Sequence, residues 1–161
     1  KLPLVIGTTG LNSNHHELIG KAKKTIPILM GSNMSIGIAT LKKSITNFLM
    51  SSHQSFSCNL IEIHHTQKVD APSGTAIEIM KFLEDLPGDK IQMPISVNSQ
   101  RIGRAFGTHR VEFYNSRETI SFQHIAHSRD IFASGAIAAA QWIISNPPGL
   151  YSFDDYLNKK L

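Results

Sequence analysis

Two imidazoles, an ammonium group and a Ser-Gly-Thr turn occur close together, between Glu62 and Ala76. Histidine exchanges protons near neutral pH, and an ammonium such as that of Lys68 can hold an anionic substrate or help to protonate it. His64 and His65 are adjacent, and adjacent residues of a strand point to opposite faces, so we expect them to have different roles. Taken alone, the pattern also fits a structural histidine beside a solvated lysine.

The turn of Ser73, Gly74 and Thr75 stands where a helix is expected to begin. The first N–H groups of a helix have no partner within it, and its dipole favours an anion there. Gly74 lets a ligand approach the backbone closely, and both neighbouring hydroxyls can take part. The alternative is that Ser73 only caps the helix. Beside the histidines and the lysine, the turn favours a site for an anion.

Two other turns follow short apolar strands expected at residues 3–6 and 26–30. The first contains Gly7, Thr8 and Thr9, and the second contains Ser32, Asn33, Met34 and Ser35. Parallel α/β sheets bind ligands at the carboxyl ends of their strands, so both turns are candidate cofactor sites. An ordinary glycine turn and a helix cap by Asn33 are the respective alternatives. The donor-rich segments 101–103 and 107–109 are of further interest.

The spacing of ligand residues predicts no metal site. Glu62 and His64 can share a strand face, but the histidine pairs lack a third carboxylate or thiolate at ligand spacing. The sequence contains neither H-E-x-x-H nor paired cysteines, and no G-x-S-x-G elbow that would indicate a serine hydrolase.

Composition indicates a packed protein, and its charge alone does not establish what it binds. Apolar residues make up 41% of the 161 residues, and no apolar run is long enough to span a membrane. The net charge is +4, but the basic residues are scattered and form no stripe for nucleic acid, whereas a small dianion fits. The single cysteine, Cys58, is expected in the core, and the absence of a leader pattern predicts a cytoplasmic protein.

Periodicity predicts an α/β part interrupted by an α+β part. The first part has a strand–helix–strand pattern and resumes in an Ala- and Gly-rich helix over 131–145, packed closely on a neighbour. Elements expected between these are a helix from 35, a strand over 59–65, a helix over 75–86 and strands over 109–114 and 119–126. We therefore expect segments 1–35 and 130–161 to flank a separate domain over 36–129.

The residues around the histidines resemble a known family signature. Segment 62–76 matches E-x-H-H-x-x-K-x-D-A-P-S-G-T-A of the dihydrodipicolinate reductases, and Val5 to Gly10 matches their V-I-G-T-T-G segment. Later landmarks follow in order at Arg101, Gly103, Gly107, His109, His124, Ser128, Arg129 and Gly135. The resemblance runs nearly from end to end of the chain.

The resemblance implies NADH- or NADPH-dependent reduction of a cyclic dicarboxylate in lysine and diaminopimelate biosynthesis. His64 would be the acid–base residue and Lys68 its partner. The substrate would bind to His65, Lys68, Ser73, Gly74 and Thr75. The nicotinamide end of the cofactor would lie against Gly7, Thr8, Thr9, Ser32, Asn33, Met34 and Ser35. The family also implies a homotetramer joined through the sheets of the substrate domain.

The family's N-terminal G-x-x-G-x-M-G turn is absent from this sequence. The chain is thus expected to be the C-terminal part of such a reductase, with a partial Rossmann-type cofactor domain and an inserted α+β domain that contains a mixed sheet. The alternative is a non-catalytic module that binds the dicarboxylate or mediates oligomerisation. A shorter segment between Leu86 and Arg101 than in many relatives is also expected.

Overall fold

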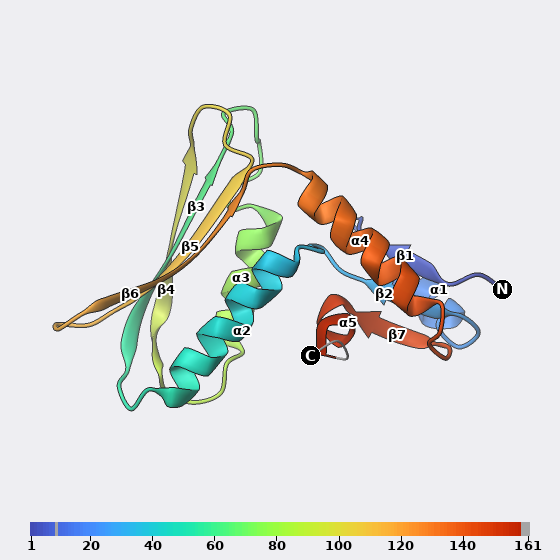
Figure 1. The fold of residues 1–161 in the computed structure, drawn as a ribbon, viewed down its shortest axis with the longest axis horizontal. Coiled ribbons are helices and arrows are strands. Elements are labelled where there is room, and N and C mark those ends of the chain that lie inside the picture. Colours follow the sequence, from blue (N-terminus) through green and yellow to red (C-terminus); the bar gives the residue numbers. More distant parts are fainter. Residues whose placement is uncertain (9, 159–161) are drawn as a thin grey trace. The chain divides into compact units, whose positions relative to one another are not determined.

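The structure is a computed structural model that describes residues 1–8 and 10–158. It divides the chain into two compact units (Figure 1). Unit 1 comprises Lys1–Ile36 and Asp130–Leu161, and unit 2 comprises Gly37–Arg129.

Unit 1 is built on a small parallel sheet. Its elements are β1 (Leu4–Ile6), α1 (Ser13–Ala22), β2 (Pro27–Met30), α4 (Asp130–Ile143), β7 (Gly149–Ser152) and α5 (Phe153–Asn158). The strand order is β1-β2-β7, with β2 in the centre and parallel to both neighbours. α4 packs against β1 and β2, and the apolar core between them includes Leu29, Ala139 and Ile143.

Small residues let α4 approach the turn after β2 closely. A Cβ added at Gly135 would stand 1.7 Å from the carbonyl oxygen of Met34 and 3.3 Å from the Phe153 ring. No side chain fits there, so the glycine is required for this packing. The expectation of a small-residue helix packed closely on a neighbour is confirmed.

Unit 2 contains a mixed sheet of four strands. Its elements are α2 (Ile36–Ser51), β3 (Phe56–His64), α3 (Gly74–Glu84), β4 (Ile91–Arg101), β5 (Gly107–Tyr114) and β6 (Thr119–Ala126). The strand order is β4-β3-β5-β6; β4 runs parallel to β3, and β5 is antiparallel to both β3 and β6. The α/β fold with a mixed sheet, predicted from the sequence, is confirmed.

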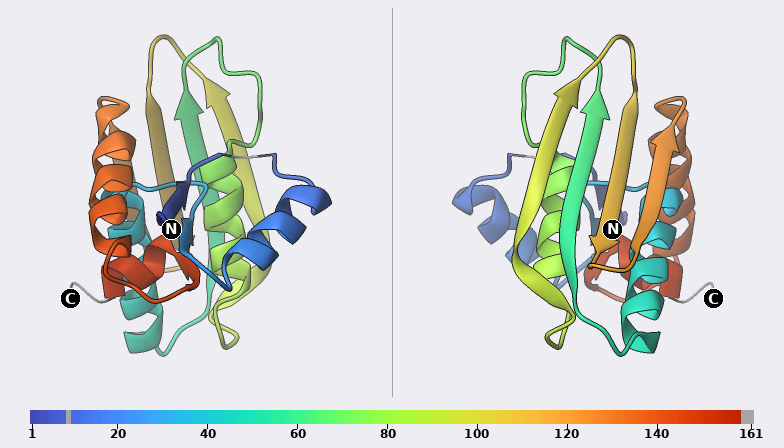
Figure 2. Two further views of the ribbon diagram at one scale, coloured as in Figure 1. Left: turned by 90° about the vertical axis from the view of Figure 1, so that its right-hand side faces the viewer. Right: turned by 90° about the vertical axis from the view of Figure 1, so that its left-hand side faces the viewer.

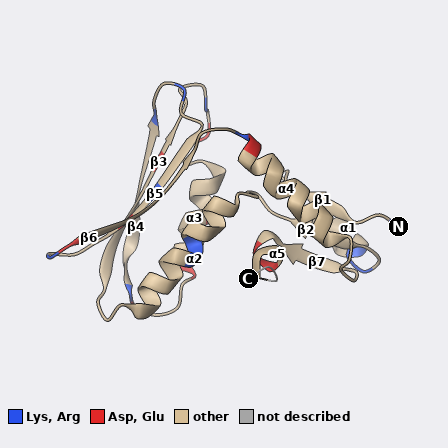
Figure 3. Cartoon of the chain, viewed as in Figure 1, with Lys and Arg blue, Asp and Glu red and all other residues tan. Residues whose placement is uncertain are grey.

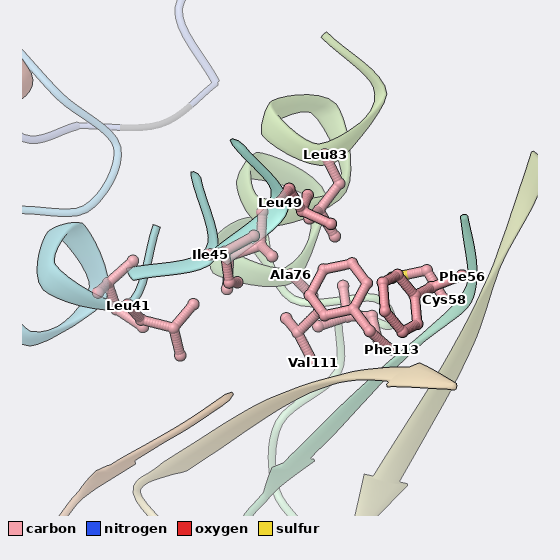
Figure 4. Packing of buried hydrophobic residues seen from close by; sticks show 12 residues of the cluster. Leu41, Ile45, Leu49, Phe56, Cys58, Ala76, Leu83, Val111 and Phe113 are labelled. Carbon is pink, nitrogen blue, oxygen red and sulfur yellow. The ribbon is translucent and has the colours of Figure 1, made fainter. Parts of the chain in front are cut away.

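The helices α2 and α3 cover one face of this sheet, and the right-hand view of Figure 2 shows the opposite face in front of them. Figure 4 shows the core between helices and sheet, where Ile45 and Leu49 of α2 and Leu83 of α3 point towards Phe56 and Phe113. Cys58 is part of this core, as expected, with 2% of its surface exposed. Burial raises the pKa of its thiol to about 12.

The helix-facing side of the sheet changes from apolar to polar along β3 and β5. On β3 the residues on this side are Phe56, Cys58, Leu60, Glu62 and His64. On β5 they are Phe113, Val111, His109 and Gly107, of which His109 is directly opposite Glu62. The alternation of a strand therefore carries the apolar core directly into a polar cluster at the carboxyl end of β3.

Two strands were not predicted, and β3 begins three residues earlier than expected. β4 contains Pro94 and many polar residues, and both features argue against a strand in the sequence. It lies at the sheet edge, and its pairing with β3 shifts register around Pro94, so the missing N–H is tolerated. β7 has only four residues and follows two prolines. Asn12 caps α1, and Ser152 and Asp155 bond each other reciprocally at the start of α5.

Positive charge is spread over the described residues of both units and forms no continuous stripe there (Figure 3). None of the described helices has the length and apolar character needed to cross a membrane.

Candidate active site

A carboxylate and an imidazole lie in contact at the carboxyl end of β3. Oε2 of Glu62 is 2.7 Å from Nδ1 of His64, and their side chains are 0% and 9% exposed. The oxygen lies off the direction of the ring N–H, so the contact is close but is not an aligned hydrogen bond. A buried carboxylate beside a buried imidazole can influence the protonation of the ring in a site that is shielded from water.

Two groups hold the other oxygen of the Glu62 carboxylate. Its Oε1 accepts hydrogen bonds from Nη2 of Arg101 at 2.9 Å and from the backbone N–H of Ser73 at 3.2 Å. Burial alone raises the pKa of Glu62, but hydrogen bonds from Ser73, Ser99 and Arg101, with the charge of His64, lower it on balance. Glu62 is therefore an anion at neutral pH, although no part of its side chain is exposed.

Burial lowers the pKa of His64, and the cations of Lys68 and Arg101 act in the same direction. Glu62 opposes this shift through its charge and its contact with the ring. A Cβ added at Gly107 would stand 3.1 Å from Nε2 of His64. The glycine thus leaves room beside the ring nitrogen that does not face Glu62.

A second buried histidine, His109, joins the cluster from β5. Its Nε2 is 3.3 Å from Oγ of Ser73, and its ring meets that of His64 edge to face at 5.2 Å between centroids. Burial, reinforced by the nearby His64, lowers the pKa of His109 to about 4. His109 is neutral at physiological pH and packs between the acid–base pair and the start of α3.

The loop after β3 is fastened by Arg101. Its guanidinium donates hydrogen bonds to the carbonyl oxygens of Lys68 and Asp70 as well as to Glu62. The ammonium of Lys68, whose side chain is 23% exposed, lies 2.7 Å from Oδ1 of Asp70. That hydrogen bond lowers the pKa of Asp70, so its carboxyl group is ionised at neutral pH. Lys68 is therefore accessible, and it has an exposed counter-ion that an anionic substrate can replace.

The turn before α3 both caps the helix and leaves an open position at its first amide groups. Oγ of Ser73 accepts the N–H of Ala76 at 3.2 Å, so the capping role left open by the sequence is present. Gly74 is exposed, and nothing lies within 4 Å of a Cβ placed on it. The first amide groups of α3 therefore begin at an open position next to the buried cluster. His65 is half-buried, and Thr75 is half-buried beside Gly74.

The predicted cofactor turns of unit 1 lie next to each other. The N–H of Gly31 donates to the carbonyl of Ile6 at 3.1 Å, which joins the ends of β1 and β2. Gly7, Thr8 and Ser32 are exposed, whereas Asn33, Met34 and Ser35 are 8%, 5% and 2% exposed. Oδ1 of Asn33 accepts the N–H of Ser35 at 2.8 Å, as the cap alternative proposed. Thr9 lies outside the described residues.

The sequence showed no third carboxylate or thiolate at ligand spacing, but the fold brings a histidine, His109, beside Glu62 and His64. His109 brings a third ligand-type atom within 4.8 Å of theirs, because β5 pairs with β3 and places it opposite Glu62. Sequence spacing cannot show a partner 47 positions away on another strand. The 2.7 Å separation of Oε2 and Nδ1 is that of a direct contact, since two ligand atoms of one tetrahedral zinc ion stand about 3.3 Å apart at the usual bond lengths.

Arg101 and Gly107 also belong to this site. The sequence marked both as members of donor-rich turns and as family landmarks, but it gave no sign that Arg101 clamps the loop or that Gly107 adjoins His64. A long-range strand pairing supplies both contacts.

The fold and the site define a class of protein: a two-unit α/β protein in which a buried histidine–carboxylate pair adjoins a helix N-terminus. Residues 37–157 match the family "Dihydrodipicolinate reductase, C-terminus". The chain belongs to the dihydrodipicolinate reductase family, which confirms the resemblance predicted from the sequence.

Named relatives agree with this assignment. The 4-hydroxy-tetrahydrodipicolinate reductase of Campylobacter lari is 40% identical over 96% of this chain and 70% of its own length. That of Bdellovibrio bacteriovorus is 39% identical over 98% of this chain and 66% of its own length. The chain thus spans about two thirds of the length of the curated relatives it matches. The predicted enzyme class, a reductase of lysine and diaminopimelate biosynthesis, is confirmed at the level of the family.

A solved structure shares the fold. "Dipicolinate bound Dihydrodipicolinate reductase from Paenisporosarcina sp. TG-14" matches with a TM-score of 0.70 and 20% identity, over 93% of this chain and 62% of that one. At this identity the match supports the architecture of the chain and not the roles of individual residues.

Proposed function

We propose that this chain carries the acid–base and dicarboxylate-binding residues of an enzyme that reduces 4-hydroxy-tetrahydrodipicolinate to tetrahydrodipicolinate. The buried Glu62–His64 pair is the observation that carries the proposal. In it, His64 supplies the proton that accompanies reduction, and Lys68 assists. A positioned acid of this kind contributes about 10² to 10⁴ in rate.

The substrate carboxylates would bind to His65, Lys68 and the first turn of α3, which contains Ser73, Gly74 and Thr75. Open space above Gly74 supports an anion at the helix N-terminus. Lys68 supports it as well, because its present partner, Asp70, is exposed. The hydroxyl of Ser73 is engaged by Ala76 and His109, so in this proposal Ser73 contributes mainly by fixing the two amides that follow it.

Hydride would come from the nicotinamide of NADH or NADPH, held by unit 1 as a partial Rossmann-type domain. The fit rests on two turns joined at the carboxyl ends of parallel strands, with the small residues Gly7, Thr8 and Ser32 exposed. Thr9 completes the proposed set at the first turn. The second turn would be supported from its buried side by Asn33, Met34 and Ser35, because their side chains are buried.

Assembly would use the sheet face of unit 2 that α2 and α3 leave uncovered (Figure 2). Tyr114 and Ile125 on that face are 41% and 46% exposed. We propose a homotetramer joined through this face, in the cytoplasm. Light scattering of the wild type against Ile125→Arg tests the interface, since a buried charge there opposes association.

The acid–base role is tested by His64→Gln, with His53→Gln as a matched control at an exposed position of the same unit. Turnover should fall by about 10² to 10⁴ in the first variant, with nucleotide affinity nearly unchanged, and should stay normal in the second. Full turnover in His64→Gln removes the acid–base assignment.

Lys68→Met should weaken dicarboxylate binding and slow turnover.

Fluorescence titration with dipicolinate and with NADH separates the two candidate functions. Binding of dicarboxylate without any binding of nucleotide favours the non-catalytic module.

A further inference from the structure

Beside the proposed acid His64, Glu62 is the most enclosed charge of the cluster. Its side chain is 0% exposed, and it contacts His64 on one oxygen and Arg101 and Ser73 on the other. Keeping a carboxylate ionised away from water is costly unless its partners compensate. A fold that keeps this anion against one nitrogen of the proposed acid therefore places it there for an effect on that ring.

The charged and titratable groups around His64 come from four segments. They are Glu62 on β3, Lys68 in the following loop, Arg101 on β4 and His109 on β5. Both cations and burial disfavour a protonated ring, and His109 is neutral at physiological pH. Glu62 is thus the only one of these groups that favours the protonated ring.

The two nitrogens of His64 have different surroundings. Nδ1 faces Oε2 of Glu62 at 2.7 Å, and Nε2 faces Gly107, where the missing side chain leaves space. Arg101 and the Ser73 amide fix the carboxylate on its other oxygen, so Oε2 cannot turn away without breaking both bonds. The neutral ring then keeps its hydrogen on Nδ1, because that atom alone has an anionic acceptor.

We propose that Glu62 is a positioning residue for His64: it holds the hydrogen on Nδ1 and leaves Nε2 as the nitrogen that gives up a proton beside Gly107. The inference rests on the proposed function of His64. In the step, the protonated ring loses its Nε2 hydrogen: the N–H bond breaks, its electron pair stays on nitrogen, the proton passes to the substrate, and the neutral ring keeps its hydrogen on Nδ1. The contact needs a small turn of the ring to become aligned, as is common for catalytic hydrogen bonds before the substrate is bound.

The test uses Glu62→Gln, with Glu78→Gln as the matched control. Glu78 is also a carboxylate paired with a cation, Lys42 at 3.1 Å, but it lies on α3 away from the cluster. Arg101 should hold the glutamine carbonyl, so the amide NH₂ would face Nδ1 and donate to it. Proton–nitrogen NMR should show the single N–H of the neutral His64 ring on Nδ1 in the wild type and in the control. In Glu62→Gln it should show this N–H on Nε2.

The titration of His64 gives a second readout. Its midpoint should fall by about one pH unit in Glu62→Gln and rise in Arg101→Met, which removes a cation instead of an anion. A general loosening of the structure would not shift the His64 midpoint in opposite directions in the two variants. Turnover in Glu62→Gln should fall about 10²-fold, more at high pH than at low pH, with a smaller change in KM for the dicarboxylate.

Failure of this inference is distinguishable from failure of the proposed function. If His64→Gln abolishes turnover while Glu62→Gln keeps the wild-type tautomer and midpoint, only the positioning role is overturned. If Glu62→Gln does not fold, Glu62→Asp replaces it: the shorter carboxylate keeps its charge but retreats from Nδ1. A lowered midpoint in Glu62→Asp supports the proposal, and an unchanged one overturns it.

Discussion

The carboxyl end of β3 and the carboxyl ends of β1 and β2 are constructed in opposite ways. At β3 the chemistry is carried by buried side chains that bind one another, with Glu62 at the centre. At β1 and β2 the exposed residues are small, Gly7, Thr8 and Ser32, and the side chains that follow Ser32 are buried. One end is suited to moving a proton at a fixed atom, and the other to letting a large ligand approach the main chain.

The difference extends to what keeps each end in place. The β3 end is held by hydrogen bonds and charge, whereas the turn after β2 is held from behind by the close passage of α4 at Gly135. The two ends should therefore respond to different changes. The protein has a separate reporter for each unit, because Trp142 lies in the core of unit 1 and Cys58 in the core of unit 2.

The largest effect is expected from Gly135→Ala, which attacks the packing of unit 1. A methyl group 1.7 Å from the Met34 carbonyl oxygen forces α4 or the turn to move, and should cost about 3 kcal/mol or more. Urea unfolding followed by Trp142 fluorescence should show this loss. Gly20→Ala on α1 is the control, since nothing lies within 4 Å of the added methyl and it should stabilise the helix by about 0.5 to 1 kcal/mol.

Thiol labelling of Cys58 in the same two variants sharpens the comparison. The buried thiol reacts only when unit 2 opens, so its labelling rate should change much less than the Trp142 transition. An equal loss by both reporters would show that the two ends do not have separate supports.

The sequence predicted this contrast only in part. The residues at each end were identified because glycine, histidine and lysine are informative in short motifs, and β3 alternates in a way that places Glu62 beside His64. The contribution of His109 and Arg101 could not be read, since each reaches Glu62 through pairing between distant segments. β4 itself was missed because Pro94 argues against a strand and an edge position tolerates it.

The next largest effect is a loss of stability at low pH, which we expect at the β3 end alone. The folded protein keeps His109 neutral down to about pH 4, whereas the unfolded chain binds the same proton near pH 6.5. The unfolded state therefore holds more protons between these values, and stability falls as the pH is lowered through this range, by about 3 kcal/mol at most for this group. His64 shifts in the same direction and adds to the slope.

His109→Gln isolates that contribution. Labelling of Cys58 at a series of pH values should give a shallower loss of stability in the variant than in the wild type. Urea unfolding followed by Trp142 should show little difference between the two proteins. A slope that His109→Gln leaves unchanged would mean that other groups cause the acid sensitivity of unit 2.

The smallest effect compares two helix caps of the same kind in different surroundings. Oγ of Ser73 caps α3 and also contacts His109 inside the cluster, whereas Asn12 caps α1, none of whose residues is buried. Ser73→Ala should cost about 2 kcal/mol, because the cap is lost and the buried Nε2 of His109 loses its partner. Asn12→Ala should cost about 0.5 to 1 kcal/mol, the value of a cap in water.

Both variants are measured by urea unfolding, with Cys58 as reporter for Ser73→Ala and Trp142 for Asn12→Ala. Ser73→Thr keeps the hydroxyl and should recover most of the loss at that position. Equal costs for the two alanine variants would contradict the view that hydrogen bonds within the cluster, rather than the local helix cap alone, hold the β3 end. A larger cost at Ser73 that Ser73→Thr restores would tie the start of α3 to the acid–base pair through one hydroxyl, because Ser73 also gives its backbone N–H to Glu62.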